Sequence, residues 1–170
     1  MRKFLVIPLA VCAAIAFATQ VRAQQPAAPP ASPPPAPLGY GEAISLAQAR
    51  AAAAAAEAEA QKNGWHMVIV VVGPTGELIY LQKADLAANA STNIAHAKAR
   101  TSATFRAPTK TYMDRLANGE NHLLTLPGAM LIAGGMPIIV GGKIIGAIEI
   151  SGASPTQGHQ TAQAGAGAVK

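Results

Sequence analysis

One unbroken apolar run, residues 67–72, constrains the fold of this chain more than any other feature of its sequence. After Met67 every position is Val or Ile, so neither alternating face of the run carries a polar residue. This pattern is typical of a strand that is covered on both faces, and β-branched residues favour strands. Gly73-Pro74-Thr75-Gly76 predicts a turn, after which residues 77–82 return as a second strand. The chain therefore needs packing layers on both sides of an antiparallel hairpin.

Helical segments flank this hairpin. Residues 42–62 contain no Gly or Pro, are dominated by alanine and stop at Asn63-Gly64, a good C-terminal cap. The remaining elements are predicted as helices over 89–105, 109–118 and 157–169 and a second hairpin over 137–151. This order predicts the α+β class, as a three-layer α/β/α sandwich with a mainly antiparallel sheet. Because tight turns rather than crossover helices join consecutive strands, a doubly wound nucleotide-binding sheet is excluded.

The first 23 residues are predicted to be a signal peptide. Met1-Arg2-Lys3 is a short basic start, Phe4 to Ala18 is an apolar run, and Val21-Arg22-Ala23 places small residues where a signal peptidase cleaves. The run is too short for a membrane-spanning helix, and we expect no membrane span after cleavage. The protein is therefore expected to be exported to the periplasm or the extracellular medium. A retained, uncleaved anchor is the alternative.

A linker is predicted over residues 24–39. Between Pro26 and Pro37, seven of twelve residues are proline, a composition that favours extended polyproline II and buries no core. We interpret it as a spacer, with a docking peptide for a partner's aromatic groove as the alternative. One folded domain is then expected over residues 40–170.

Charge and cysteine content exclude several functions. Charged residues make up 12% of the chain, about half of the usual 25%. The formal net charge of +5 falls to +2 without residues 1–23, because these hold three of the 13 Lys and Arg and none of the eight Asp and Glu. We therefore expect no nucleic-acid partner. Cys12 is the only cysteine, and its removal with the signal peptide excludes disulfides, thiolate metal sites and cysteine nucleophiles.

The most informative stretch is residues 94–109, on the predicted second helix and the junction after it. Helical spacing places Lys98 beside Thr101, Thr101 beside Phe105, and His96 beside Arg100 on an adjoining face. Such side chains can flank an anionic ligand with an apolar body. The alternative is an amphipathic helix with a solvated basic face. The candidate binding residues are His96, Lys98, Arg100, Thr101, Phe105, Arg106 and Thr109.

This stretch belongs to a pattern that extends over residues 43–165. Its parts are the K-A-x-T motif at Lys98 with Pro108-Thr109 downstream, the hairpin core 68–78, the G-G-x-P-I run 134–138 and the I-x-x-S-G-A segment 148–153. In order and spacing these parts resemble the GlcG/HbpS-like haem-degrading family. The resemblance implies a profilin-like sandwich, homo-oligomers, and binding and sometimes slow breakdown of haem. Other relatives in the family are associated with glycolate or corrinoid metabolism.

The resemblance makes haem, held non-covalently, the leading ligand hypothesis. Haem needs an apolar slot, cations for its propionates and an axial donor. Phe105 and Met113 are expected to line the slot, and Lys98, Arg100 and Arg106 to meet the propionates. In a chain without cysteine neutral imidazole is the best axial donor, and His96 lies inside the family motif, so it is the expected metal ligand.

Three positions depart from the family pattern: Gly73, the segment 83–87 and Glu149. A buried carboxylate is costly unless it is paired or protonated. We therefore expect Glu149 to face solvent or a subunit interface, with a site residue of raised pKa as the alternative.

Two other functions stay open. One is a non-enzymatic oligomeric scaffold or sensor that binds a small carboxylate such as glycolate, and the other is a hydrolase or isomerase that uses Glu149 with a histidine.

Overall fold

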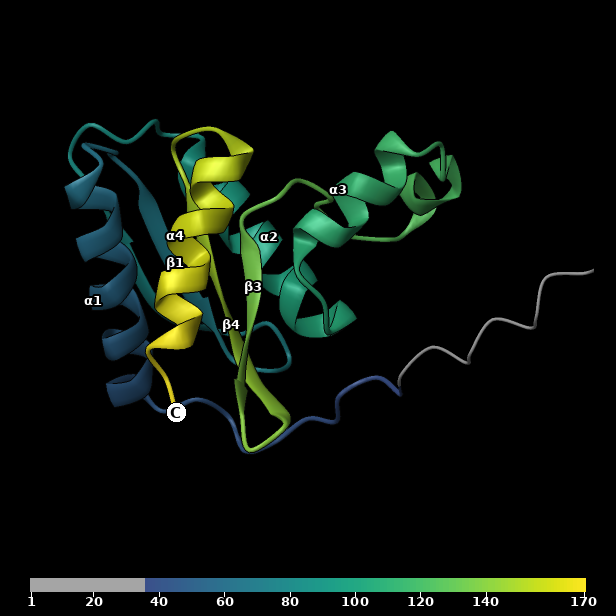
Figure 1. The fold of residues 1–170 in the computed structure, drawn as a ribbon, viewed down its shortest axis with the longest axis horizontal. Helices are drawn as coiled ribbons and strands as arrows, with labels where there is room; N and C mark the ends of the chain where they lie inside the picture. The colour runs from purple at the N-terminus through teal and green to yellow at the C-terminus, as the bar shows by residue number, and fades with distance from the viewer. Residues whose placement is uncertain (1–35) are drawn as a thin grey trace, which may run out of the picture. The chain divides into compact units, whose positions relative to one another are not determined.

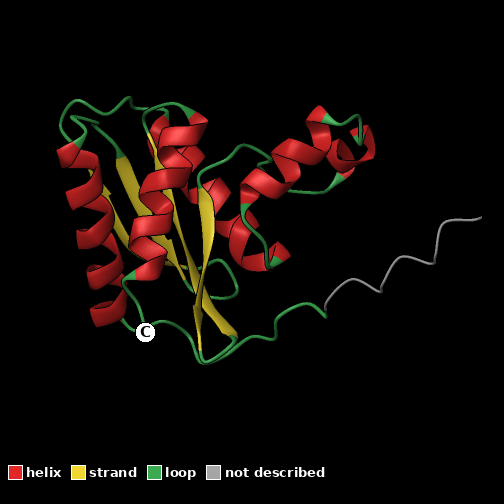
Figure 2. Ribbon diagram, in the orientation of Figure 1, coloured by secondary structure: helices red, strands yellow, loops and turns green. Residues whose placement is uncertain are grey.

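The two predicted hairpins form one four-stranded antiparallel sheet (Figures 1 and 2). In the computed structural model, which describes residues 36–170, the strand order is β2-β1-β4-β3. The strands are β1 (Val68–Val72), β2 (Leu78–Lys83), β3 (Gly135–Val140) and β4 (Lys143–Ser151). The predicted signal peptide and most of the predicted linker lie outside the described residues. No helix within 36–170 is long and apolar enough to cross a membrane.

Helices cover both faces of the sheet, which confirms the predicted three-layer α/β/α sandwich. Helices α1 (Leu46–Lys62) and α4 (Pro155–Gly167) cover one face, and α2 (Ser91–Phe105) covers the other (Figure 1). The alternation along β1 explains why: Ile69 and Val71 join the α1/α4 core, and Val68, Val70 and Val72 join the α2 core. All five β1 side chains are buried, as the unbroken apolar run predicts.

Small residues let the helices approach the sheet closely. The buried side of α1 consists of five alanines, and α2 contributes three alanines to the opposite core. A side chain at Gly165 of α4 would lie 2.9 Å from the Ala52 carbonyl oxygen of α1 and 2.5 Å from Ile148 of β4. With packing this close, even one added methyl group would destabilise the fold.

The first helix begins later than predicted. The structure starts it at Leu46 rather than at residue 42, because Ser45 and Gln48 form a capping box that closes its first turn. The residues before the cap run beside β4 instead. Tyr40 bridges Ile144, and the Ile44 amide donates to the Ile145 carbonyl oxygen at 2.8 Å.

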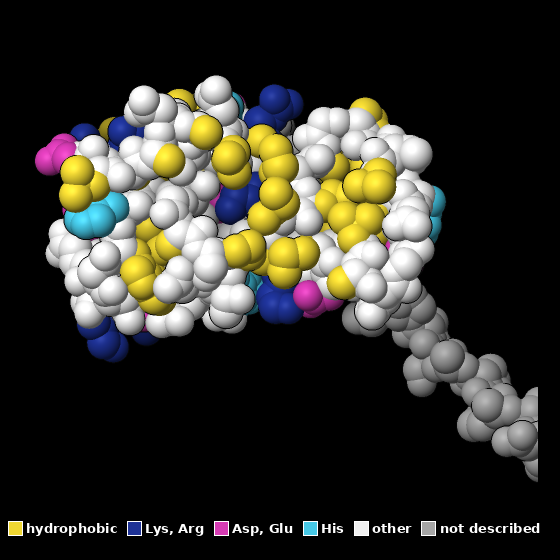
Figure 3. Space-filling view, turned by 90° about the horizontal axis from the view of Figure 1, so that it is seen from above, with side chains coloured by type: hydrophobic (Ala, Val, Ile, Leu, Met, Phe, Trp, Pro, Cys, Tyr) yellow, Lys and Arg dark blue, Asp and Glu magenta, His cyan; other side chains and the backbone are white. Residues whose placement is uncertain are grey.

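A small lobe lies outside the three layers (Figure 1). It contains α3 (Thr109–Ala117) and a single 3₁₀ segment, η1 (Asn121–Thr125), which the sequence analysis did not predict. Figure 3 shows hydrophobic side chains gathered on this lobe and along its boundary with the sandwich. Leu124, at 71%, and Ile132, at 43%, are exposed here. The lobe is therefore less completely packed than the sandwich.

Substitution of Gly146 in β4 tests how closely the sheet is packed. A methyl group there would come 2.3 Å from the Val72 carbonyl oxygen, so Gly146→Ala should lower the free energy of unfolding by about 1–3 kcal/mol. Gly167→Ala is the matched control, because nothing lies within 4 Å of its added methyl group. Urea unfolding should leave this control unchanged or slightly stabilised. Equal effects of the two substitutions would contradict the packing described here.

Candidate functional site

A buried ion pair joins α2 to β4. The Lys98 ammonium contacts the Glu149 carboxylate, and the two side chains are 4% and 0% exposed. The same ammonium donates hydrogen bonds to the carbonyl oxygens of Ala133 at 3.1 Å and Ile150 at 3.3 Å. The expectation that Glu149 faces solvent or a subunit interface is therefore wrong. Its carboxylate is tolerated inside the protomer because Lys98 supplies the compensating charge.

Burial sets the protonation behaviour of this pair. Desolvation raises the pKa of Glu149 well above its usual value, although the Lys98 ammonium and the Ile150 backbone act in the opposite direction. Gly134 lies against the pair: a side chain there would fall 2.6 Å from Lys98 Nζ and 2.7 Å from Glu149 Oε1. The loop that leads into β3 thus closes directly over the two charges.

The predicted threonines bind the protein's own backbone. Thr101 Oγ1 accepts a hydrogen bond from the Met130 amide at 2.8 Å, and Thr109 Oγ1 accepts one from the Gly135 amide at 2.9 Å. Both residues are at most 1% exposed. With Lys98 they fasten the segment 130–135 to α2 and to the start of α3, so these three side chains make structural contacts.

The predicted residues Arg100 and Phe105 of α2, and Arg106 at its C-terminal cap, lie elsewhere. Arg100 packs at the β1–β2 turn, where a side chain at Gly76 would meet its Cγ at 3.0 Å. Phe105 makes an edge-to-face contact with Tyr112, with ring centroids 5.9 Å apart. Arg106 stacks on Tyr40 at 5.7 Å from the ring centroid. The structure thus does not bring the seven predicted binding residues together on one surface.

His96, the predicted axial ligand, is half-buried on α2. Its Nε2 atom is buried and has no hydrogen-bond partner within residues 36–170. An unpartnered ring nitrogen has the chemistry of a metal ligand. However, a group outside the protein does not reach this atom unless neighbouring side chains move.

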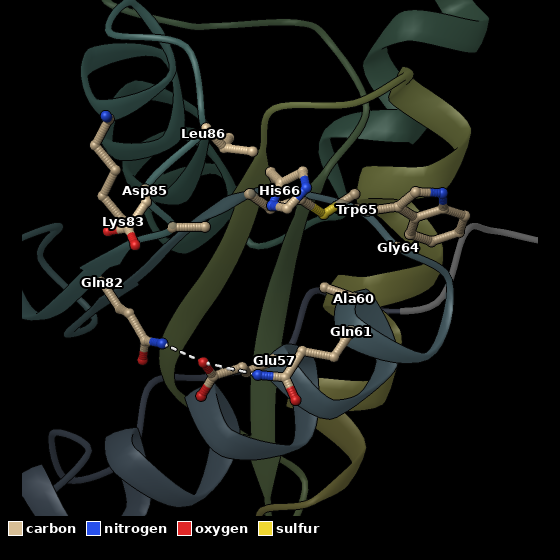
Figure 4. A pocket seen from close by; sticks show the side chains of 12 residues that line it. Glu57, Ala60, Gln61, Gly64, Trp65, His66, Gln82, Lys83, Asp85 and Leu86 are labelled. Carbon is tan, nitrogen blue, oxygen red and sulfur yellow. Dashed lines mark hydrogen bonds between the residues drawn. The ribbon is translucent and has the colours of Figure 1, made fainter.

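A pocket that the sequence analysis missed lies at the end of α1 (Figure 4). Its volume is about 580 Å³, within the usual range of roughly 300–1,000 Å³ for small-molecule and cofactor sites. Residues 57–67 form one side, and residues 82–86, from the end of β2 and the turn after it, form the other. The side chain of His66 is exposed in it. The one signal in the sequence is Trp65-His66, an aromatic ring and an imidazole directly after a helix cap.

Amide side chains hold the acidic group on the pocket wall. Glu57 Oε1 accepts hydrogen bonds from Gln82 Nε2 at 2.6 Å and Gln61 Nε2 at 3.2 Å (Figure 4). Tyr80 in turn donates to Gln82 Oε1 at 2.9 Å. This chain of hydrogen bonds joins α1 to the edge strand β2 and fixes the width of the pocket.

The remaining histidines have other surroundings. His122 is exposed on η1, with Nε2 3.8 Å from Glu120. His159 on α4 has a buried Nδ1 that finds no hydrogen-bond partner among residues 36–170. Burial, followed by the charge of Lys110, lowers the pKa of His159, whereas Asp114 raises it. Within residues 36–170 no three His, Cys, Asp or Glu side chains gather to hold a metal ion by themselves.

Comparison with known proteins places these features in a family. The family model described as "Haem degrading protein HbpS-like" matches residues 44–167. GlcG of Escherichia coli K12 is 38% identical over 91 residues, which cover 54% of this chain and 68% of GlcG. These matches confirm the predicted family resemblance.

Solved structures agree with this assignment. A double mutant of Streptomyces reticuli HbpS superposes with a TM-score of 0.70 at 33% identity, covering 85% of this chain and 99% of HbpS. A complex of PduOC with haem has a TM-score of 0.67 at 24% identity, covering 75% of this chain and 96% of PduOC. The second similarity shows a shared fold. The profilin-like sandwich expected from the resemblance is thereby confirmed.

Because Lys98 belongs to a buried ion pair, its substitution should cost much more stability than substitution of a surface lysine. Lys98→Met should destabilise the protein by about 3–5 kcal/mol, because it leaves the buried Glu149 without its counter-charge. The double variant Lys98→Met/Glu149→Leu should recover much of this loss. Lys110→Met is the control: Lys110 pairs with Asp114 at the surface, and we expect a change below about 1 kcal/mol. Denaturant unfolding of the four proteins would refute the account if both lysine variants lost the same stability.

The pH dependence of stability tests the same pair. Because the pKa of Glu149 is higher in the folded than in the unfolded state, its contribution is present below about pH 4.5 and is lost as the pH rises toward the folded-state pKa. This fall should extend to higher pH, and be larger in total, in Lys98→Met, where no ammonium opposes the rise in the pKa of Glu149. Glu149→Gln should remove it. Thermal unfolding from pH 4 to 8 measures the slopes, and a Glu149→Gln slope equal to that of the unsubstituted protein would contradict the assignment.

Proposed function

Since this chain belongs to the HbpS-like family of haem-degrading proteins, we propose that it binds haem non-covalently. The observation that carries the proposal is the extent of the family match, because residues 44–167 contain every helix and strand of the described sandwich. A protein of the same fold, PduOC, has been solved as a haem complex. Breakdown of bound haem in the presence of peroxide would be chemistry of the cofactor's iron.

The described residues supply the kinds of group that haem requires. These are an apolar surface, cations for the propionates and an axial donor. Residues 36–170 contain four histidines and no cysteine, so imidazole is the expected donor. Exposed cations are present at Lys83, Arg100 and Arg106, and exposed leucines at several places on the surface. The predicted α2 site with His96 as axial ligand stays a prediction, and variants can test it.

We also propose that the protein is exported. The basic start, apolar run and small residues of positions 1–23 support a cleaved signal peptide. The proline-rich residues after it would then tether the haem-binding domain, which begins near Tyr40.

A homo-oligomer is the expected assembly. β2 is an edge strand of the sheet, and its Leu78 and Leu81 are 50% and 39% exposed. An edge strand with exposed leucines presents unpaired backbone groups and apolar surface together, which supports pairing with a second copy.

Titration with hemin tests the proposed function. We expect the chain from residue 24 onward to saturate with one hemin per protomer and to shift the Soret band. Glycolate is the comparison ligand, because a sensor of small carboxylates would bind it without any chromophore. A hemin titration without saturation, together with calorimetric binding of glycolate, would reject haem in favour of the small-carboxylate function.

A further inference from the structure

We propose that the pocket between the end of α1 and the end of β2 is the haem site, with His66 as the axial ligand. This inference rests on the proposed function and adds to it the position of the haem and the residue that coordinates its iron. The pocket brings an imidazole, a cation and apolar side chains to one surface, which the predicted residues of α2 do not do.

The imidazole ring of His66 is more accessible from solvent than that of His96. His66 is exposed, and Figure 4 shows its ring in the middle of the pocket, between Trp65 and the end of β2. The Nε2 of His96 is buried within the protein. An axial ligand needs a ring nitrogen that an incoming iron can reach, and the exposed ring of His66 meets this requirement more fully than the half-buried ring of His96.

Apolar side chains line the pocket, and one of them, Leu86, is open to solvent. Ala60 and Met67 form buried parts of the wall, and Trp65 is half-buried beside them. Leu86 stands at the other side with 75% of its surface exposed. An exposed leucine at the wall of a pocket gains free energy when a ligand covers it. A flat apolar macrocycle is a ligand of that kind.

Lys83 is the cation of the pocket, and Glu57 and Asp85 are its acidic side chains. Asp85 is exposed, so water and salt screen its charge. Lys83 is exposed, and in Figure 4 its ammonium lies at the outer edge of the pocket, away from His66. Propionates, which prefer the solvent edge, would meet a cation there. Glu57 is the acidic group of the α1 wall, and two amide donors already satisfy it. Its charge is therefore less repulsive toward an anionic ligand than that of a free carboxylate.

The pocket is also built on fixed elements. Lys83 pairs in register with Val68, so the β2 wall is held by the sheet. The α1 wall is closed by backbone hydrogen bonds to the Ala60 carbonyl oxygen from the amides of Asn63, at 3.2 Å, and Trp65, at 2.9 Å. The connections that carry His66 and Leu86 follow directly after these two fixed walls.

Single histidine variants test the assignment. Hemin is titrated into the chain from residue 24 onward, which contains the whole compact unit Pro35–Lys170, and into three variants. His66→Ala should weaken hemin binding by at least about tenfold and change the Soret band. Added imidazole should restore the band. His96→Ala and His122→Ala should bind within about twofold of the unsubstituted protein.

A fourth variant tests the pocket independently of the axial ligand. Leu86→Ser changes an exposed side chain, so it should weaken hemin binding while leaving the melting temperature unchanged. The inference is overturned if the unsubstituted protein saturates and His66→Ala binds equally well, or if His96→Ala alone loses the spectrum. In those cases haem binding stands and the site moves. Failure of the unsubstituted protein to saturate would instead reject the proposed function itself.

Discussion

The buried contact between Lys98 and Glu149 is the interaction on which the arrangement of this domain depends. Two charges removed from water are costly, and this pair is retained where α2, β4 and the loop into β3 meet. One ammonium contacts the carboxylate and two carbonyl oxygens. It thereby fixes the distance of α2 from the sheet and the position of Gly134. Thr101 and Thr109 extend the same fastening along the loop.

This arrangement commits much of α2 to structural contacts, and the haem site that we propose lies in another part of the domain. Alanines and glycines bring the helices so close to the sheet that the layers contain little room for a ligand. Open space remains where the elements end. At the end of α1 the helix cap, the beginning of β1 and the end of β2 diverge, and the pocket with His66 lies between them. A haem site at the end of the sandwich is thus compatible with a core that is closely packed throughout.

Most of the fold could be predicted from the sequence because local signals determine it. The Val and Ile run, the glycine turns and the alanine-rich helix give the elements, their order and the layers. The start of α1 was misplaced because the Ser45 and Gln48 capping box begins the helix at Leu46, and the Ile44 amide before it donates to β4 instead. The segment η1 was missed because five residues give no periodic signal.

The candidate site was less predictable: helical spacing shows which side chains are neighbours but not which side is buried. Lys98 could be assigned to the interior only with knowledge of Glu149, 51 positions away, and the pocket joins segments that give no sign of proximity in the sequence.

The most direct test of the account is a crystal structure of the hemin-loaded protein, with iron located by its anomalous scattering. We predict one iron per protomer beside the ring of His66, inside the pocket between α1 and β2, with the Lys98 and Glu149 contact unchanged. An iron bound next to His96 and α2, with the pocket empty, would contradict the account.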